Sequence, residues 1–478
     1  MLLSELYGAQ NLDGNLEITG ITCNSKQVKK GYAFVCLKGA ASDGHKYASD
    51  AVKAGASVIF AEHDTGEKNQ IIVKDTHECY FKLSSKWFNE PSKKLKLIGV
   101  TGTNGKTSVT YMIKAILEKA GYSVGLIGTI HNMIKDRVIE THNTTPDAFT
   151  LNSLFADMVE SGCEYAVMEV SSHALDQKRI CNVIFEEALF TNLTQDHLDY
   201  HKTMENYLLA KKKLFKMCKK AILNSDDSYY KQMAQGLDCP VITYSASNDS
   251  DYSAKGINYH PAGVEYELVT KGSINHISVN TGGRFTVYNS LCAIVAAIEL
   301  GIPVKTAADA IGELHGVKGR AEVVQTGTDY TVIIDYAHTP DGLKNILSTF
   351  RECKKNRLIV LFGCGGDRDK TKRPIMGNVA VHNADYVIVT SDNPRTEDPE
   401  AIINDILEGI KGIHTPYKVI VNRKEAIKYA LSIARKDDII VLAGKGHETY
   451  QILNSGTIHF DEREVVSDAL KELKEKGE

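Results

Sequence analysis

Short apolar runs rich in valine and isoleucine alternate with helical patterns along most of this chain, and this alternation constrains its fold more than any other feature. The runs are 96–100, 165–170, 331–336, 357–363, 386–392 and 438–444. Strands that helices cover on both faces have such continuous apolar runs, which are typical of parallel sheets. The stretches 107–121 and 287–301 have the apolar spacing of helices. The pattern predicts an α/β protein with parallel sheets.

The chain is too long for a single hydrophobic core. Its 478 residues correspond to about three domains of typical size. Two polar segments, 89–96 and 316–329, are candidate linkers. We therefore predict domains over residues 1–94, 95–320 and 325–478.

Composition and charge exclude several classes of protein. Hydrophobic residues at 43% and charged residues at 24% are ordinary for a soluble globular protein. The net charge of −4 offers no basic field to nucleic acid, so anionic ligands must bind at local sites. The N-terminal residues lack the basic region of a secretory signal, and no apolar run reaches the ~18 residues that span a bilayer. The ten cysteines form no CxxC pair, so we expect free thiols and a cytoplasmic protein. From the charge and the apolar runs we expect no nucleic-acid partner and no membrane insertion.

Residues 97–110 (LIGVTGTNGKTSVT) combine an apolar run, a glycine-rich turn and the start of a helix. Gly102 and Gly105 allow the backbone to curl so that its N–H groups face a phosphate. Lys106 would reach the outer phosphates, and Thr107 would ligate Mg²⁺. The segment predicts a phosphate loop, which indicates nucleotide binding without specifying a reaction.

Two glycine-rich patterns are imperfect. The strict Walker spacing has a glycine where this chain has Val100. The segment GCGGDR (363–368) fails the dinucleotide-binding pattern because Arg368 occupies the third glycine position. A nicotinamide enzyme is therefore a weaker alternative.

The form TGTNGKTS (101–108) of the loop resembles that of the Mur ligase superfamily, ATP-dependent enzymes that add amino acids to the peptide stem of peptidoglycan precursors. Further segments resemble the family's motifs in the same order: NSKQVKKGYAFVCLKGAASDGH (24–45), NTTPD (143–147), MEVSSHALDQKR (168–179), NLTQDHLDYH (192–201), DYAHTPD (335–341), GCGGDRDKTKRPIM (363–376), SDNPR (391–395) and GKGHETYQ (444–451). The resemblance is strongest to the ligases that join a diamino acid to UDP-N-acetylmuramoyl-L-alanyl-D-glutamate. The departures from the family pattern are Asn24, Lys318, Thr286 and Asn422, none at a core catalytic position.

The resemblance implies three α/β domains: a small N-terminal uridine-nucleotide domain, a central mononucleotide-binding parallel sheet with the phosphate loop, and a C-terminal Rossmann-like domain. It implies that the γ-phosphate of ATP passes to a carboxylate, that an amine attacks the acyl phosphate, and that two Mg²⁺ ions take part. The implied catalytic residues are Lys106, Glu169, His197 and Lys211. The implied metal ligands are Thr107, Glu169, His197 and a CO₂-derived carbamate on Lys211 (N6-carboxylysine).

The lysine run 211–213 interrupts an apolar segment, and such runs are most often a solvated helix face. At about 100° per residue, Lys211 lies at the centre of an apolar face and Lys213 points roughly opposite. That face is formed by Met204, Tyr207, Leu208, Leu214 and Phe215. Because an inward lysine must be neutralised or paired, Lys211 is distinct from its neighbours. Carbamylation, which the resemblance implies, needs the neutral amine that burial among cations favours.

The resemblance also implies ligand-binding residues. For ATP they are Gly102, Thr103, Asn104, Gly105, Lys106, Thr107, Ser108, Asn289, Arg320 and His338, with Asp341 beside His338. For UDP-N-acetylmuramoyl-L-alanyl-D-glutamate they are Ser25, Asn143, Thr144, Thr145, Ser171, Gln177 and Arg179.

The segment DNPR (392–395) resembles the form specific for meso-diaminopimelate. That amino acid has a distal carboxylate which lysine lacks, and the guanidinium of Arg395 can hold it bidentately. Asp392 and Glu448 suit the accompanying ammonium group. The full implied set is Arg373, Asp392, Asn393, Pro394, Arg395, Gly444 and Glu448.

Other functions remain possible from the sequence. The first alternative is a lysine-adding ligase of the same family. Folylpolyglutamate synthetase shares the phosphate loop but should lack the segments 24–45 and 392–395. A phosphate-loop ATPase that is not a ligase would leave the motifs of the third domain unexplained. We expect a monomer.

Overall fold

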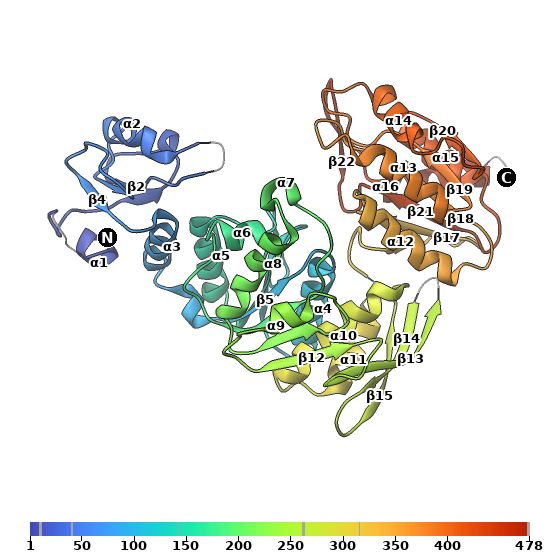
Figure 1. Ribbon diagram of the computed structural model, residues 1–478, viewed down its shortest axis with the longest axis horizontal. Helices are drawn as coiled ribbons and strands as arrows, with labels where there is room; N and C mark the ends of the chain where they lie inside the picture. Colours follow the sequence, from blue (N-terminus) through green and yellow to red (C-terminus); the bar gives the residue numbers. More distant parts are fainter. Residues whose placement is uncertain (9–11, 40–41, 142, 261–262, 315, 476–478) are drawn as a thin grey trace. The chain divides into compact units, whose positions relative to one another are not determined.

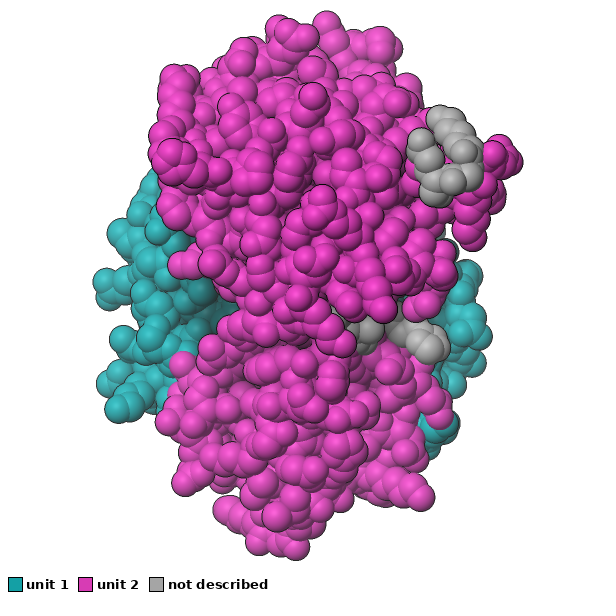
Figure 2. Space-filling model, turned by 90° about the vertical axis from the view of Figure 1, so that its right-hand side faces the viewer, with its two compact units in different colours: residues 1–223, 227–242 teal, residues 224–226, 243–478 magenta. Residues whose placement is uncertain are grey.

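The computed structural model describes residues 1–8, 12–39, 42–141, 143–260, 263–314 and 316–475 (Figure 1). The chain divides into two compact units, coloured separately in Figure 2. Unit 1 contains residues 1–223 and 227–242, and unit 2 contains residues 224–226 and 243–478.

The N-terminal part of unit 1 is a four-stranded parallel sheet in the order β1-β2-β3-β4. The strands are β1 (Gly20–Thr22), β2 (Tyr32–Val35), β3 (Val58–Ala61) and β4 (Gln70–Ile72). The helices are α1 (Leu3–Leu6), α2 (Ala48–Lys53) and α3 (Thr76–Trp87). Asp75 caps α3 by accepting a hydrogen bond from the Glu78 amide, and the helix buries Tyr80, Phe81 and Leu83.

The larger sheet of unit 1 has the strand order β11-β10-β5-β9-β6-β7-β8. Neighbouring strands are parallel from β11 to β6, and β7 and β8 are antiparallel additions. The bounds are β5 (Lys96–Thr101), β6 (Val124–Ile127), β7 (Asn132–Ile134), β8 (Arg137–Ile139), β9 (Tyr165–Glu169), β10 (Phe185–Phe190) and β11 (Ala221–Asn224). Because β5, β6, β9 and β10 run in the same direction, their following loops meet at one edge of the sheet.

The helices of this part of unit 1 connect those strands. They are α4 (Lys106–Lys119), α5 (Ala148–Glu160), α6 (Ser172–Asp176), α7 (Leu198–His201), α8 (Met204–Lys212) and α9 (Tyr230–Ala234). Helix α4 begins directly after the glycine-rich turn and packs against β6 and β9. This packing fixes the turn at the end of β5.

The first part of unit 2 contains strands β12 (Val241–Ser245), β13 (Tyr252–His260), β14 (Gly263–Val269) and β15 (Ile274–Val279). Strand β12 pairs with β13 in parallel, whereas β13 with β14 and β14 with β15 are antiparallel pairs. Side chains of β14 alternate between buried and half-buried, as expected for a strand with one covered face. Helices α10 (Arg284–Glu299) and α11 (Val304–Glu313) pack on these strands.

The C-terminal sheet of unit 2 has the order β16-β17-β21-β18-β19-β20. All pairs are parallel except β16 with β17. The strands are β16 (Glu322–Val324), β17 (Thr331–Asp335), β18 (Leu358–Phe362), β19 (Tyr386–Val389), β20 (Tyr417–Val419) and β21 (Ile439–Ala443), and a hairpin of β22 (Tyr450–Leu453) and β23 (Gly456–His459) follows.

Two hydrophobic cores lie on the two faces of this sheet. Along β17, Ile333 belongs to one core, whereas Val332 and Ile334 belong to the other. One face is covered by α12 (Pro340–Cys353), α13 (Lys372–Asn383) and α14 (Pro399–Glu408), and the other by α15 (Arg423–Ser432) and α16 (Glu462–Glu475) (Figure 1). This double covering explains why the strands are continuous apolar runs.

The predicted α/β fold with parallel sheets is confirmed. All six predicted strands and both predicted helices are present, and their ends differ from the prediction by at most three residues. The antiparallel strands were not predicted, because short half-buried strands such as β7 and β8 have no continuous apolar run. They make the larger sheet of unit 1 mixed at one edge. No helix in the described ranges combines the length and apolar character needed to cross a membrane. The domain boundaries stay predictions.

Candidate active site

The phosphate loop follows β5 and leads into α4. Gly105 has φ +87°, the left-handed region that favours glycine, and it precedes the first residue of the helix. A Cβ on Gly102 would lie 1.9 Å from Thr191 Oγ1, so the loop backbone needs glycine there. Lys106 Nζ donates hydrogen bonds to the carbonyl groups of Gly102 and Thr103, each at 2.8 Å. The lysine thus lies over the loop, within reach of any phosphate that the loop amides bind.

The segment 191–194, after β10, braces the loop. The amide of Thr103 donates to the Asn192 carbonyl at 2.9 Å, and that of Asn104 donates to Asn192 Oδ1 at 2.9 Å. The amide of Thr194 donates to Thr103 Oγ1 at 3.0 Å. Sequence reasoning assigned no role to these residues, although the segment lies within a family motif.

A buried hydroxyl–carboxylate pair adjoins the loop. Glu169 ends β9, has 1% of its surface exposed, and accepts a hydrogen bond from Thr107 Oγ1 at 3.0 Å. Hydroxyl and carboxylate oxygens are ligands that Mg²⁺ prefers, so the donor set fits the predicted ion. In the part of the chain that the structure describes, no cluster of three or more His, Cys, Asp or Glu side chains is arranged to hold a metal.

Thr129, just after β6, holds Glu169 in place and was missed by sequence reasoning. Its amide donates to Glu169 Oε1 at 2.8 Å, and its hydroxyl donates to Glu169 Oε2 at 2.9 Å. Its Oγ1 also lies 3.0 Å from Thr144 Oγ1. Hydroxyl groups thus link Thr144, a predicted substrate residue, to the carboxylate. The available signal was the position of Thr129 directly after an apolar run.

Lys211 on α8 faces inward, as predicted. Only 1% of its surface is exposed, and Nζ donates to the Gly102 carbonyl at 2.8 Å and lies 4.5 Å from the Tyr207 ring centre. Burial lowers the pKa of Lys211 well below its ordinary value, and the nearby Lys106 lowers it further. Lys211 and Lys106 therefore share one carbonyl acceptor, and the buried amine favours its neutral form.

The two neighbouring lysines face elsewhere. Lys212 donates to the carbonyl groups of Gln232 and Gln235, at 2.6 and 2.5 Å. Lys213, 45% exposed, pairs with Asp176 at 2.7 Å. The prediction that Lys211 faces inward while Lys213 faces the solvent is confirmed.

His197 is exposed and directly precedes α7, in a left-handed conformation with φ +54°. Its Nε2 lies 3.3 Å from Asp196 Oδ2, and its ring centre lies 6.2 Å from that of Tyr207. The Tyr207 ring therefore contacts both the Lys211 amine and the His197 ring. Metal ligation by His197 stays a prediction.

Several predicted substrate residues meet at the ends of β9 and α6. Thr145 Oγ1 donates to the Glu169 carbonyl at 2.9 Å, and the Ser171 amide donates to Thr145 Oγ1 at 3.0 Å. Arg179 donates to the Thr145 carbonyl and to Gln177 Oε1, each at 3.0 Å. Burial lowers the pKa of Arg179 from its ordinary value. This half-buried guanidinium is suited to an anionic group.

Lys178, between Gln177 and Arg179, ties this loop to the N-terminal sheet region. It has φ +50°, and Nζ lies 2.6 Å from Asp75 and 2.7 Å from Glu78 at the start of α3. The residues flanking it are thereby held relative to the part of unit 1 that contains Ser25. Ser25 opens a short 3₁₀ helix that Asn24 caps, and Asn143 is exposed.

The predicted ATP residues of unit 2 lie on α10 and on the loops around β17. Asn289 is buried on α10. Arg320 lies over the Tyr336 ring at 4.8 Å, and His338 Nδ1 hydrogen-bonds to the Tyr336 carbonyl at 2.8 Å. Tyr336 thus brings Arg320 and His338 together. Their contact with ATP stays a prediction.

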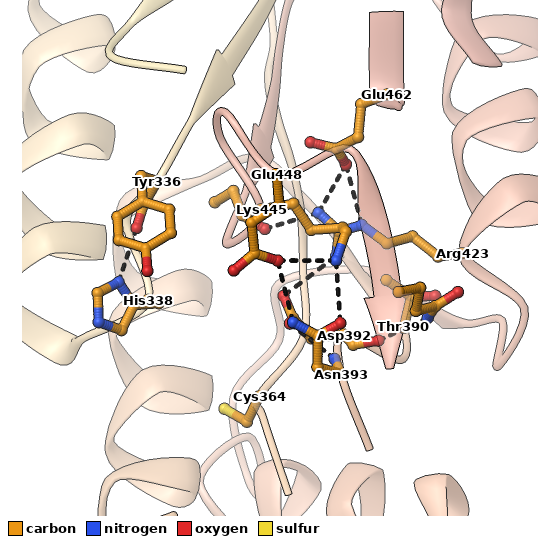
Figure 3. A network of polar contacts seen from close by, with 12 residues as sticks. Tyr336, His338, Cys364, Thr390, Asp392, Asn393, Arg423, Lys445, Glu448 and Glu462 are labelled. Atoms are coloured by element: carbon orange, nitrogen blue, oxygen red, sulfur yellow. Dashed lines mark hydrogen bonds and ion pairs between the residues drawn. The ribbon is translucent and has the colours of Figure 1, made fainter. Parts of the chain in front are cut away.

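The loops after β19 and β21 form a polar network (Figure 3). Asn393 Nδ2 donates to Glu448 Oε2 at 3.0 Å, and Lys445 Nζ donates to Asn393 Oδ1 at 3.1 Å and to Glu448 Oε2 at 3.0 Å. A Cβ on Gly444, where φ is +117°, would lie 2.5 Å from Asp392 Oδ2. Four of the predicted residues for the added amino acid therefore lie together.

A buried ion pair supports this network from behind. Arg423 and Glu462 are fully buried, and Arg423 Nη2 lies 2.8 Å from Glu462 Oε1. Burial raises the pKa of Glu462, and the Arg423 guanidinium opposes the rise. Arg423 Nη1 has no hydrogen bond to the described residues and lies 4.0 Å from Asp392 Oδ2. The positive guanidinium and the Asp392 carboxylate thus face each other without a direct hydrogen bond through Nη1.

The guanidinium groups of Arg395 and Arg373 differ in how many of their nitrogens hydrogen-bond to other groups of the protein. Arg395 has φ +54°, and Nη1 donates to the Gly366 carbonyl at 2.7 Å. Its Nε and Nη2 make no hydrogen bond to the described part of the chain, so they are available to a carboxylate. Arg373 is 1% exposed and is held by Glu397 and Asp405, each at 2.9 Å. A direct contact of Arg373 with a ligand stays a prediction, and the structure places the residue in a buried internal network.

The departures from the family pattern have local structural roles. Lys318 Nζ lies 3.6 Å from Asp461, Thr286 Oγ1 donates to the Gly282 carbonyl at 3.0 Å, and Asn422 caps α15 by accepting from the Glu425 amide. Each of these side chains is held within unit 2.

The chain combines a phosphate loop, an adjoining hydroxyl–carboxylate pair and a separate C-terminal sheet that helices cover on both faces. These features define an ATP-binding enzyme built from several α/β parts. Three family models match the chain: Mur ligase family, catalytic domain (residues 17–84), Mur ligase middle domain (100–297) and Mur ligase, glutamate ligase domain (319–446). The chain belongs to the Mur ligase family, as the resemblance predicted.

Curated relatives cover nearly the whole chain. A UDP-N-acetylmuramoyl-L-alanyl-D-glutamate–2,6-diaminopimelate ligase of Clostridium botulinum is 50% identical over 99% of both chains. The protein of that name from Caldanaerobacter subterraneus subsp. tengcongensis is 49% identical over 96% of both. A solved structure of a ligase with that name is 32% identical over 99% of both chains, with a TM-score of 0.74.

Thr129→Val tests the support of Glu169. The variant removes one hydrogen bond to a buried carboxylate, which costs about 1–3 kcal/mol, and we expect the Mg²⁺ concentration for half-maximal activity to rise roughly tenfold. Thr129→Ser should restore the original requirement. Thr457→Val, an exposed change on β23, is the matched control. An unchanged Mg²⁺ titration for Thr129→Val would show that Thr129 does not position Glu169.

Proposed function

We propose that this protein is an ATP-dependent ligase that joins meso-2,6-diaminopimelate to the D-glutamate carboxylate of UDP-N-acetylmuramoyl-L-alanyl-D-glutamate, in peptidoglycan precursor synthesis. The observation that carries the proposal is the juxtaposition of a partly uncommitted guanidinium, Arg395, with the Glu448 carboxylate through Asn393. Arg395 Nη1 lies 3.5 Å from the Asn393 carbonyl, and Asn393 Nδ2 donates to Glu448. Such an arrangement of side chains complements the carboxylate and ammonium at the distal end of diaminopimelate. The full-length relatives of that name support it.

The activation step uses groups of unit 1. A carboxylate oxygen of the substrate attacks the γ-phosphorus of ATP, the bond to ADP breaks, and an acyl phosphate forms. The loop amides and Lys106 neutralise the phosphate charge and hold the reacting groups in line. Thr107 and Glu169 would hold Mg²⁺, which when bound neutralises charge on the phosphates. Arg179, beside Thr145, would hold an anionic group of the substrate.

The amide forms in the second step. The amine of diaminopimelate attacks the acyl carbon, the C–O bond to phosphate breaks, and the nitrogen releases a proton. Arg395 and Glu448 hold the distal end of the amino acid and so orient the amine. Lysine would leave Arg395 without its carboxylate partner, which costs about 1–3 kcal/mol.

The proposal includes carbamylation of Lys211 and a second Mg²⁺ held with His197. The neutral amine of Lys211 adds to the carbon of CO₂ and loses a proton, and the product is an anion. Support comes from its burial, its lowered pKa and its place beside Lys106, whose positive charge would attract the anion. A cytoplasmic location, supported by ten free cysteines, and a monomeric state complete the proposal.

Phosphate release from ATP tests the function directly. The protein is assayed with UDP-N-acetylmuramoyl-L-alanyl-D-glutamate and with diaminopimelate, lysine or no amino acid. We expect release that requires both the nucleotide substrate and diaminopimelate. Equal rates with lysine would identify the lysine-adding alternative, and release independent of both substrates would identify an ATPase that is not a ligase.

Arg395→Ala tests the assignment of the distal carboxylate. Because charged hydrogen bonds contribute about 1.5–3 kcal/mol, kcat/KM for diaminopimelate should fall roughly 10- to 150-fold while KM for ATP stays within about twofold. Arg435→Ala, an exposed change in the same unit, is the control. Unchanged diaminopimelate kinetics would remove Arg395 from the site.

Lys211→Ala tests the modified lysine. We expect loss of activity that short carboxylates such as acetate or formate restore in part, because they replace the missing anion. Lys212→Ala should remain active, since its side chain contacts only main-chain carbonyl groups of 232 and 235 among its hydrogen bonds. An active Lys211→Ala beside an inactive Lys212→Ala would contradict the assignment. Mass spectrometry at neutral pH can detect the added carbamate.

A further inference from the structure

Lys445 is a fully buried lysine to which the sequence pattern assigned no role. It lies in the loop after β21, next to Gly444, and 0% of its surface is exposed. Its Nζ donates to Asn393 Oδ1 at 3.1 Å and to Glu448 Oε2 at 3.0 Å, as Figure 3 shows. A buried cation of this kind is costly unless it is paired, so its partners define what it does.

The hydrogen bonds around Lys445 determine the orientation of Asn393. Asn393 Oδ1 accepts from Lys445 and also from the Ile452 amide at 2.9 Å. Both neighbours are donors only, so the oxygen of the amide must face them and Nδ2 must face away. Nδ2 consequently donates to Glu448 Oε2 at 3.0 Å.

The same bonds determine which oxygen of Glu448 is available. Glu448 Oε2 accepts from both Lys445 and Asn393, whereas Oε1 accepts no hydrogen bond from the described part of the chain. The Glu448 side chain is 13% exposed. Rotation of its carboxylate would take Oε2 away from both donors. Oε1 is thus the acceptor left for a ligand ammonium.

We propose that Lys445 is a positioning residue that sets the amino-acid specificity of the site by fixing Glu448 and Asn393. This inference rests on the proposed function and extends it from the residues that touch diaminopimelate to the one that orients them. Lys445 acts through Glu448, and its removal frees the carboxylate to turn and the Asn393 amide to flip. The ammonium of diaminopimelate then loses its preset acceptor, while ATP binding is unaffected.

The nearby Arg423 does not replace this cation. Arg423 is held by Glu462 through Nε at 2.9 Å and by the Ala443 carbonyl through Nη2 at 2.8 Å. Its Nη1 lies 4.0 Å from Asp392 Oδ2, too far for a hydrogen bond. Among the described residues, Lys445 is therefore the cation that hydrogen-bonds to Glu448.

A double-mutant cycle on the full-length protein tests the proposal. Lys445→Met, Glu448→Gln and the double variant are compared for KM with diaminopimelate, ATP and the UDP substrate, and for kcat. We expect Lys445→Met to raise KM for diaminopimelate at least tenfold and to leave the other two KM values within about twofold. In the Glu448→Gln background the same change should have less than a threefold effect. Lys445→Arg should restore part of the lost affinity.

Controls separate positioning from folding. Lys471→Met makes the same change at a lysine whose side chain is 71% exposed in the same unit. Circular dichroism and Tm report folding, and Lys445→Gln, which keeps a donor, replaces Lys445→Met if that variant does not fold. Equal rises in all three KM values, or independent effects of the two substitutions, would overturn the inference. A parent protein without diaminopimelate-dependent phosphate release would instead refute the proposed function.

Discussion

The parallel pairing of β5 with β9 on one side and with β10 on the other is the constraint on which the candidate site of unit 1 depends. It places three strand ends together, with the phosphate loop between Glu169 and the segment 191–194. The loop needs both neighbours, because its amides are positioned by Asn192 and its hydroxyl partner Thr107 by Glu169. A parallel sheet thus assembles the site from segments that are 62 to 91 residues apart in the chain.

The C-terminal sheet uses the same geometry for a different purpose. Strand β21 lies between β17 and β18, and β19 follows β18. Because these four strands are parallel, the loops that follow them lie along one edge of the sheet. Those loops contain few apolar side chains. The Arg423 guanidinium donates a hydrogen bond to the Ala443 carbonyl at the end of β21. The pair of Arg423 with Glu462 is fully buried, so the charges beside these loops are matched inside the protein.

Two buried lysines show how different partners give the same residue opposite properties. Lys211 has a carbonyl acceptor and a neighbouring cation, and burial lowers its pKa toward the neutral amine. Lys445 is paired with the Glu448 carboxylate at 3.0 Å and so retains a matched countercharge. The first environment suits a lysine that reacts with CO₂, and the second suits a lysine that holds other side chains in place.

The sequence by itself determined the α/β class, the phosphate loop and the inward orientation of Lys211, because apolar runs and helical spacing are local properties of the chain. The sequence also contains the family motifs, which pointed to Glu169, Arg179, Arg395 and Glu448 as site residues. Only the tertiary structure decided which side chains support them. Thr129, Asn192 and Lys445 act across strands distant in sequence, and their roles depend on hydrogen bonds that no local pattern records. The ion pairs of Arg373 on α13 with Glu397 and with Asp405 on α14 cannot be read from the sequence either, because contacts between separate elements depend on tertiary packing.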